Sequence, residues 1–164
     1  MRRLFFAFFL VVACATGAAA GAYEDAISAL KREDYGRAAQ LFRPLAEQGN
    51  TNARNNLGRM YANGQGVPLD YQEAVKWYRM AAKQGNGEAQ FSLGLMYDSG
   101  QGVPQDFIRA HMWYNLAAAA LSDDSGKKAM EHRDRVASQV AAVQLAKAQE
   151  MARRCQQSQF KECD

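Results

Sequence analysis

The chain repeats itself with a period of 36 residues. Residues 51–86 align with residues 87–122 without a gap, and 16 of the 36 aligned positions are identical. A period of this length is typical of stacked copies of one supersecondary unit, each of which buries its apolar face against its neighbours. The chain is therefore expected to fold as an array of such units.

Two helices are predicted in each copy. The identical positions Ala53, Leu57 and Tyr61 lie on one face of a first helix, and Ala74, Trp77, Tyr78, Ala81 and Ala82 lie on one face of a second. Residues 64–68 between them, Gly-Gln-Gly-Val-Pro, form a turn, because glycine takes positive φ and proline stops a helix. Small residues such as Gly58 are expected to let neighbouring helices approach closely.

The start of the second helix carries its own signal. Asp70 stands at the N-cap position, and Glu73 completes a possible capping box with it. The paired glycines of the turn, Gly64 with Gly66 and the copy at residues 100–102, lack the lysine and the preceding strand of a phosphate loop. They are interpreted as turns.

Weaker copies flank the two full repeats. Residues 21–50 form a partial repeat, with a first helix from about Tyr23 to Lys31, a turn at residues 32–33 and Pro44 expected to kink the second helix. Residues 123–164 have lost the pattern and are expected to form a helical cap. After a turn cluster at residues 122–126, helices are predicted at Lys127–Ala137 and Gln139–Arg154.

Residues 1–20 have the composition of an export signal. Arg2 and Arg3 precede the apolar run Leu4–Val12, which is too short to span a bilayer, and Ala18-Ala19-Ala20 fits a cleavage site. Cleavage there is favoured, giving a periplasmic or secreted protein. Val11-Val12-Ala13-Cys14 also resembles a lipobox, so an outer-membrane lipoprotein anchored through Cys14 stays an alternative.

Charge and cysteines restrict the function further. Without residues 1–20 the chain keeps 18 Lys and Arg against 17 Asp and Glu, which gives no electrostatic footprint for nucleic acid. Two cysteines remain, Cys155 and Cys163, and in an oxidising compartment they are candidates for one disulfide. A continuous helix would hold them about 12 Å apart, so pairing requires the helix to end near residues 156–158.

No catalytic or metal constellation is recognised. Trp77 and Trp113 share one repeat position and are interpreted as core, as are the tyrosines at positions 61, 78, 97 and 114. His111 and His132 have no supporting ligand set and are interpreted as ordinary surface histidines. No enzyme activity, cofactor or metal is expected.

The identical positions together resemble the Sel-one-like repeat, a relative of the tetratricopeptide repeat. The pattern A-x3-L-G-x2-Y-x2-G-x-G-V-x2-D-x3-A-x2-W-Y-x2-A-A holds at every listed position in both full copies. The resemblance implies an all-α fold, an α/α solenoid of stacked antiparallel helix pairs that forms a right-handed superhelix with a concave face. It also implies a scaffold or adaptor role.

In the tetratricopeptide relatives the first helix of each pair lines the concave face. Helical spacing then selects Asn52, Asn55, Arg59 and Ala62 in one copy, and Glu88, Phe91, Leu95 and Asp98 in the next. These positions differ between copies, as a specific ligand would require, although an unconstrained surface would differ too. The leading hypothesis is an exported scaffold that binds a protein or peptide in this groove.

The resemblance also raises an enzymatic alternative. Some cysteine-rich exported relatives are linked with binding or hydrolysing β-lactams. Their pattern carries a cysteine pair in each repeat, whereas both full repeats here contain none. This departure argues against carrying the activity over.

Overall fold

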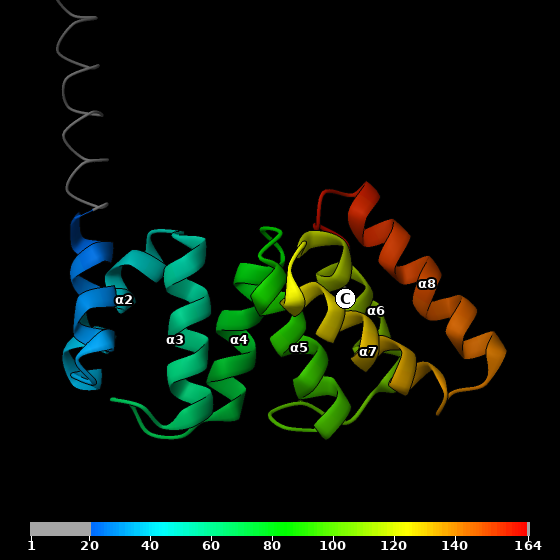
Figure 1. The fold of residues 1–164 in the computed structure, drawn as a ribbon, viewed down its shortest axis with the longest axis horizontal. Coiled ribbons are helices and arrows are strands. Elements are labelled where there is room, and N and C mark those ends of the chain that lie inside the picture. Colours follow the sequence, from blue (N-terminus) through cyan, green and yellow to red (C-terminus); the bar gives the residue numbers. More distant parts are fainter. Residues whose placement is uncertain (1–20, 164) are drawn as a thin grey trace, which may run out of the picture.

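The computed structural model describes residues 21–163, and this part of the chain is helical throughout, with helices joined by turns (Figure 1). A helix over residues 21–31 comes first. It is followed by α2 (Tyr35–Glu47), α3 (Thr51–Asn63), α4 (Tyr71–Ala82), α5 (Gly87–Ser99), α6 (Phe107–Ala120), α7 (Asp124–Ala137) and α8 (Ala142–Gln157). Within the described residues, no helix is long and apolar enough to cross a membrane.

The helix starts follow the repeat. The side chains of Asn50 and Asn86 accept hydrogen bonds from backbone N–H groups at the starts of α3 and α5. Asp34, Asp70 and Asp106 do the same for α2, α4 and α6. A short polar side chain at each start satisfies backbone donors that the helix leaves unpaired. The period of 36 residues is therefore also a period of helix caps.

Glycines in the long turns explain how one helix pair meets the one before it. Gly66 has φ +71°, and a Cβ atom there would lie 2.2 Å from the carbonyl oxygen of Tyr35 at the start of α2. Gly102 has φ +73°, and its Cβ would lie 2.3 Å from the corresponding oxygen of Tyr71. Both the backbone conformation and the close approach require glycine.

The repeated aromatic residues form the core, which confirms the sequence interpretation. Trp113 and Tyr114 are fully buried, and Trp77 and Tyr78 are nearly so. The glycine of the first helix leaves room for one of these rings: a Cβ on Gly58 would lie 2.8 Å from Cδ1 of Tyr78. The core thus runs continuously from the N-terminal helix to α6 and the C-terminal cysteines.

Details at three predicted helix starts differ from the expectation: those of α4, of α7, and of α8, which begins at Ala142 and not at Gln139. Asp70 caps α4, but Glu73 does not complete a capping box: the Asp70 N–H donates to the Tyr61 carbonyl, and Glu73 pairs with Lys76 instead. In the second case, α7 begins at Asp124, inside the predicted turn cluster, because Asp123 caps it. α2 continues as one helix past Pro44.

The C-terminal region keeps the repeat register for one more helix and then leaves it. α7 packs on α6 as α5 packs on α4, and it begins 37 residues after the start of α5, within one residue of the repeat period. α8 packs against α6 rather than against α7, on the outside of the array (Figure 1). After α8 ends at Gln157 the chain folds back, and Cys163 pairs with Cys155 across a Cα–Cα distance of 4.6 Å.

Candidate functional site: a groove along the first helices

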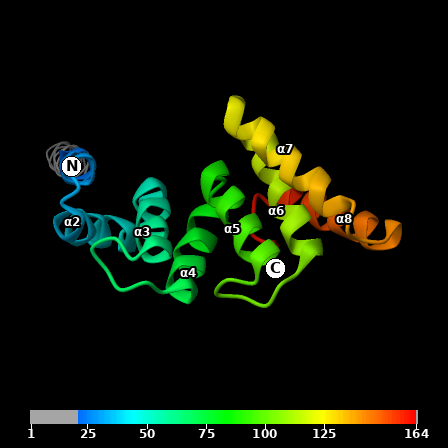
Figure 2. The same ribbon diagram turned by 60° about the horizontal axis from the view of Figure 1, so that its bottom comes forward.

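The first helices of successive pairs, α3, α5 and α7, lie along one side of the molecule (Figure 2). Two adjoining hollows open on this side, and we call them together the groove. The amide hollow, of about 350 Å³, is lined by Tyr23, Asn52, Asn55, Asn56, Asn86, Gly87, Glu88 and Leu121. The aromatic hollow, of about 300 Å³, is lined by Asn55, Arg59, Tyr78, Glu88, Phe91, Ser92, Leu121, Ser125 and Lys128. Asn55, Glu88 and Leu121 line both.

Hydrogen bonds between helices hold the side chains of the amide hollow. Asn55, which is 7% exposed, donates from Nδ2 to a carboxylate oxygen of Glu88 at 2.8 Å, so α3 is bonded directly to α5. Nδ2 of Asn56 donates to the Tyr23 hydroxyl at 3.2 Å and to the Asn52 carbonyl at 3.0 Å. These bonds fix the amides of the hollow before any ligand arrives.

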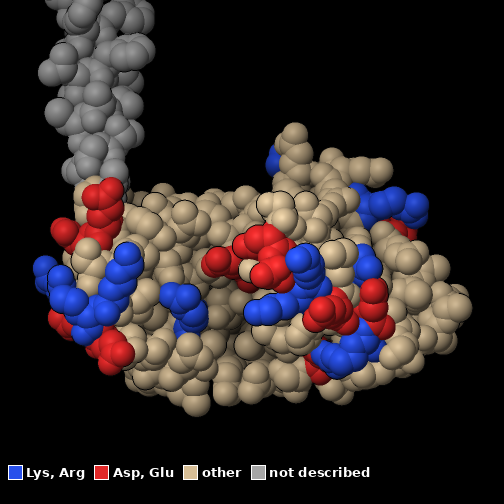
Figure 3. Space-filling view, viewed as in Figure 1, with Lys and Arg blue, Asp and Glu red and all other residues tan. Residues whose placement is uncertain are grey.

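The aromatic hollow has an apolar floor and a charged rim. Tyr78 is buried, and Phe91 and Leu121 are half-buried. Arg59 and Lys128 are exposed, and Arg59 donates to Oδ1 of Asn56 at 2.9 Å. Burial raises the pKa of the Tyr78 hydroxyl, so it stays neutral. On the face turned to the reader in Figure 1, acidic side chains gather next to basic ones near the middle of the molecule (Figure 3).

Most of the predicted groove residues line these hollows, and three do not. Asn52, Asn55, Arg59, Glu88 and Phe91 lie in the groove. Ala62, Leu95 and Asp98 lie outside it, and Ala62 and Leu95 pack against the hydrophobic core.

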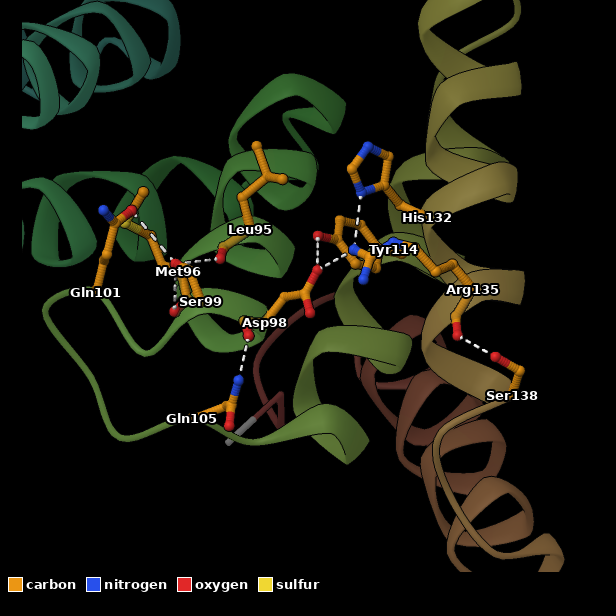
Figure 4. A network of polar contacts seen from close by, with 10 residues as sticks. All are labelled: Leu95, Met96, Asp98, Ser99, Gln101, Gln105, Tyr114, His132, Arg135 and Ser138. Carbon is orange, nitrogen blue, oxygen red and sulfur yellow. Dashed lines mark hydrogen bonds and ion pairs between the residues drawn. The ribbon is translucent and has the colours of Figure 1, made fainter.

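Asp98 is occupied inside the protein. Its carboxylate accepts a hydrogen bond from the Tyr114 hydroxyl at 3.1 Å and forms an ion pair with Arg135 of α7 (Figure 4). Burial, together with the Asp98 carboxylate, raises the pKa of Tyr114. The hydrogen bond to Asp98 raises the pKa of Arg135. Asp98 thus joins α5 to α6 and α7.

Several groove residues escaped the sequence prediction. They are Tyr23, Asn56, Asn86, Gly87, Ser92, Leu121, Ser125, Lys128 and the core residue Tyr78. A signal for some of them exists in the sequence: Asn56, Ser92 and Lys128 are separated by 36 residues each. Extending the period of 36 residues from Ser92 into the C-terminal region, where the repeat residues are no longer identical, would have selected Lys128.

The interpretation of His111 as a surface residue is wrong. Its side chain is buried in α6 with 3% exposure, and Nδ1 has no hydrogen-bond partner. Burial, and then the charge of Arg133, lower its pKa, whereas Asp134 raises it. The equivalent residue one repeat earlier is Val75, which is also buried. The apolar residue at this repeat position could therefore have predicted that His111 is buried.

His132 is half-buried rather than freely exposed. Its ring centroid lies 5.3 Å from that of Phe91 and 5.2 Å from that of Tyr114. It therefore packs at the end of the groove, beside the apolar floor. Among the described residues, no group of three or more His, Cys, Asp or Glu side chains is placed to hold a metal ion.

The Sel1 repeat model matches residues 18–50, 51–86 and 87–120, so the N-terminal copy is matched as well as the two full ones. No curated protein matches the chain.

Two solved structures are similar to this fold. One is c5321, a protective antigen of uropathogenic Escherichia coli strains that displays an SLR fold, with 29% identity, a TM-score of 0.78, and coverage of 91% of this chain and 31% of that one. The other is a Sel1 repeat protein from Oxalobacter formigenes, with 29% identity, a TM-score of 0.60, and coverage of 71% and 53%. This chain thus spans 31% of the length of the first and 53% of the length of the second. Its three matched repeats and its all-helical fold place it in the Sel1 repeat family.

Proposed function

We propose that this protein is a binding scaffold without catalytic activity, and that it holds a protein or peptide segment in the groove. The observation that carries the proposal is the convergence of five sequence-selected residues on two adjoining hollows. Those residues come from two successive repeats whose core positions agree while these positions differ. A repeat protein gains specificity in this way, because the core preserves the stack and the lining varies.

The lining matches the chemistry of a polypeptide. Asparagine side chains offer both donors and acceptors, so the amide hollow can pair with the N–H and C=O groups of an extended backbone. The aromatic hollow offers Phe91 and Leu121 to an apolar side chain. A preformed lining also lowers the entropic cost of binding, since its side chains are already held by hydrogen bonds.

We further propose that the protein works outside the cytoplasm, in the periplasm or secreted. The export-type sequence of residues 1–20 supports this, and so does the pairing of Cys155 with Cys163, because such bonds persist in oxidising compartments. Mass spectrometry of the mature N-terminus tests it. A chain that begins at Gly21 agrees with cleavage, an acylated Cys14 reveals a lipoprotein, and an intact Met1 contradicts export.

The binding role is tested by affinity capture from an extract of the source cells. The bait is the mature protein, compared with a variant that carries Asn55→Ala, Arg59→Ala and Phe91→Ala. The matched control carries Arg37→Ala and Lys147→Ala, two exposed residues outside the groove. We expect the wild type and the control to capture the same partner in similar amounts. The groove variant should capture at least tenfold less of it. Equal capture by all three proteins would refute the assignment to the groove.

A further inference from the structure

We infer that the segment held in the groove is an extended stretch of polypeptide that carries an acidic side chain next to a large apolar one. This inference rests on the proposed function and specifies its ligand. It is drawn from the aromatic hollow, where floor and rim differ in chemistry.

The floor of this hollow selects an apolar side chain. Phe91 and Leu121 are half-buried, and the ring of Tyr78 beneath them is only 4% exposed. Removing such surface from water is favourable in proportion to the area covered, by about 25 cal/mol per Å². A leucine or phenylalanine of the ligand would cover the part of the floor that the protein leaves open.

The rim selects an acidic side chain. Arg59 on α3 and Lys128 on α7 are both exposed and both line the hollow. Within the described part of the chain, neither residue forms an ion pair. The Arg59 guanidinium donates a hydrogen bond to the side chain of Asn56, which is neutral. Two cations against the single carboxylate of Glu88 give the lining of this hollow a net positive charge above an apolar floor, which complements an anionic group on the ligand.

The one acid of the hollow does not cancel this preference. Glu88 lies on the wall shared with the amide hollow, where one of its carboxylate oxygens accepts from Nδ2 of Asn55, and its single negative charge stands against the two positive charges of Arg59 and Lys128. The amide hollow beyond it contains no other charged residue in its lining. The ligand backbone is therefore expected over the asparagines, with the acidic–apolar pair over the aromatic hollow.

Peptide pools test this inference directly. The probes are acetylated, C-terminally amidated nonapeptides, random except for a fixed central pair: Glu-Leu, Gln-Leu or Lys-Leu. We expect labelled wild-type protein to bind the Glu-Leu pool at least fivefold better than the other two. The charge-reversed variant Arg59→Glu/Lys128→Glu should prefer the Lys-Leu pool, and the control Lys147→Glu on α8 should bind like the wild type.

The outcomes separate this inference from the proposed function. Equal binding of the Glu-Leu and Gln-Leu pools, abolished by Phe91→Ala, would overturn the acidic preference and keep the groove as a peptide site. A second set of the same pools is made with free C-termini. Binding confined to this set would also overturn the acidic preference, because the groove would then recognise the terminal carboxylate and not an acidic side chain. Absence of binding to every pool, or binding that neither Phe91→Ala nor the charge reversal changes, would overturn both. Circular dichroism of each variant verifies the fold.

Discussion

The guanidinium of Arg79 donates a hydrogen bond of 2.8 Å to the hydroxyl of Tyr97, which lies 18 residues further along the chain. Arg43 and Tyr61 form the same bond one repeat earlier, at 2.6 Å. In each case the arginine belongs to the second helix of one pair and the tyrosine to the first helix of the next. The bond therefore connects successive pairs, and it recurs with the period of the sequence.

Loss of the tyrosine hydroxyl should weaken this connection. Tyr97 is 5% exposed, and Tyr97→Phe removes the acceptor while keeping the ring, so we expect the free energy of unfolding to fall by about 1 kcal/mol. Urea unfolding followed by circular dichroism measures the change. The matched control is Tyr71→Phe at a half-buried tyrosine, where a change within about 0.5 kcal/mol is expected. Equal effects of the two substitutions would show that the bond contributes nothing.

The repeat register explains how far the sequence could predict this molecule. It places the caps, the turns and the core aromatic residues, because those positions face the same surroundings in every copy. It also selects Asn52, Asn55, Arg59, Glu88 and Phe91, which do line the groove. Each of these facts depends only on contacts within one copy or with the next.

The prediction of groove residues fails for side chains whose neighbours come from the C-terminal region. Leu95 packs on the core and Asp98 bonds to Arg135, since α7 lies beside α5 there. α7 has lost the residues that identify a repeat, so its place could not be inferred from identity alone. Asn115 and Arg133 stand 36 residues after Arg79 and Tyr97. Here the donor comes from the first helix of the next pair, because Arg133 on α7 donates to the side-chain Oδ1 of Asn115 on α6 at 3.4 Å.

The turn glycine at residue 66 should tolerate no side chain. Gly66→Ala places a Cβ 2.2 Å from the Tyr35 carbonyl oxygen and strains a residue at φ +71°, so the turn and the start of α2 must shift. We expect a loss of about 2–4 kcal/mol in the free energy of unfolding, at the upper end for a single substitution. Thermal and urea unfolding measure it.

A second glycine provides the control for this substitution. Gly36 lies in the first turn of α2, and a Cβ there meets nothing within 4 Å. Gly36→Ala should raise stability by about 0.5–1 kcal/mol, because alanine loses less backbone entropy in a helix. If Gly66→Ala were as harmless as Gly36→Ala, the proposed close approach between turn and helix would be incorrect.

The buried His111 should make stability depend on pH. Its pKa is lowered in the folded protein, first by burial and second by Arg133, so the unfolded chain binds the proton more tightly than the folded one. Stability is then fully present above the unfolded pKa of about 6.5 and falls as the pH drops towards the folded pKa. Urea unfolding at pH 7.5 and at pH 5.5 should give a smaller free energy at the lower pH.

The substitution His111→Val isolates this contribution. Valine occupies the equivalent buried position 75, so the repeat accommodates it. The difference in stability between pH 7.5 and pH 5.5 should be smaller in this variant than in the wild type. An unchanged difference would mean that other groups cause the pH dependence.

The bond between Cys155 and Cys163 should stabilise the C-terminal cap. It closes a loop across a sequence separation of eight residues, and both cysteines are buried. The closed loop also contains Phe160, whose ring lies 3.4 Å from a Cβ built on Gly85 in the turn between α4 and α5. The tail is thereby held against the second repeat, and the bond restricts the unfolded chain more than the folded one.

Replacing both cysteines by alanine tests this role without burying a hydroxyl. For Cys155→Ala/Cys163→Ala we expect a loss of about 2–3 kcal/mol in the free energy of unfolding, as the entropy of so short a loop implies. Hydrogen exchange should accelerate most in α8 and in the tail that follows it, because α8 packs chiefly on α6 and the bond fastens the tail to α8. A reducing agent should destabilise the wild type by a similar amount and leave the double variant unchanged. If reduction had no effect on the wild type, packing around Phe160 and α6 alone would hold the cap in place.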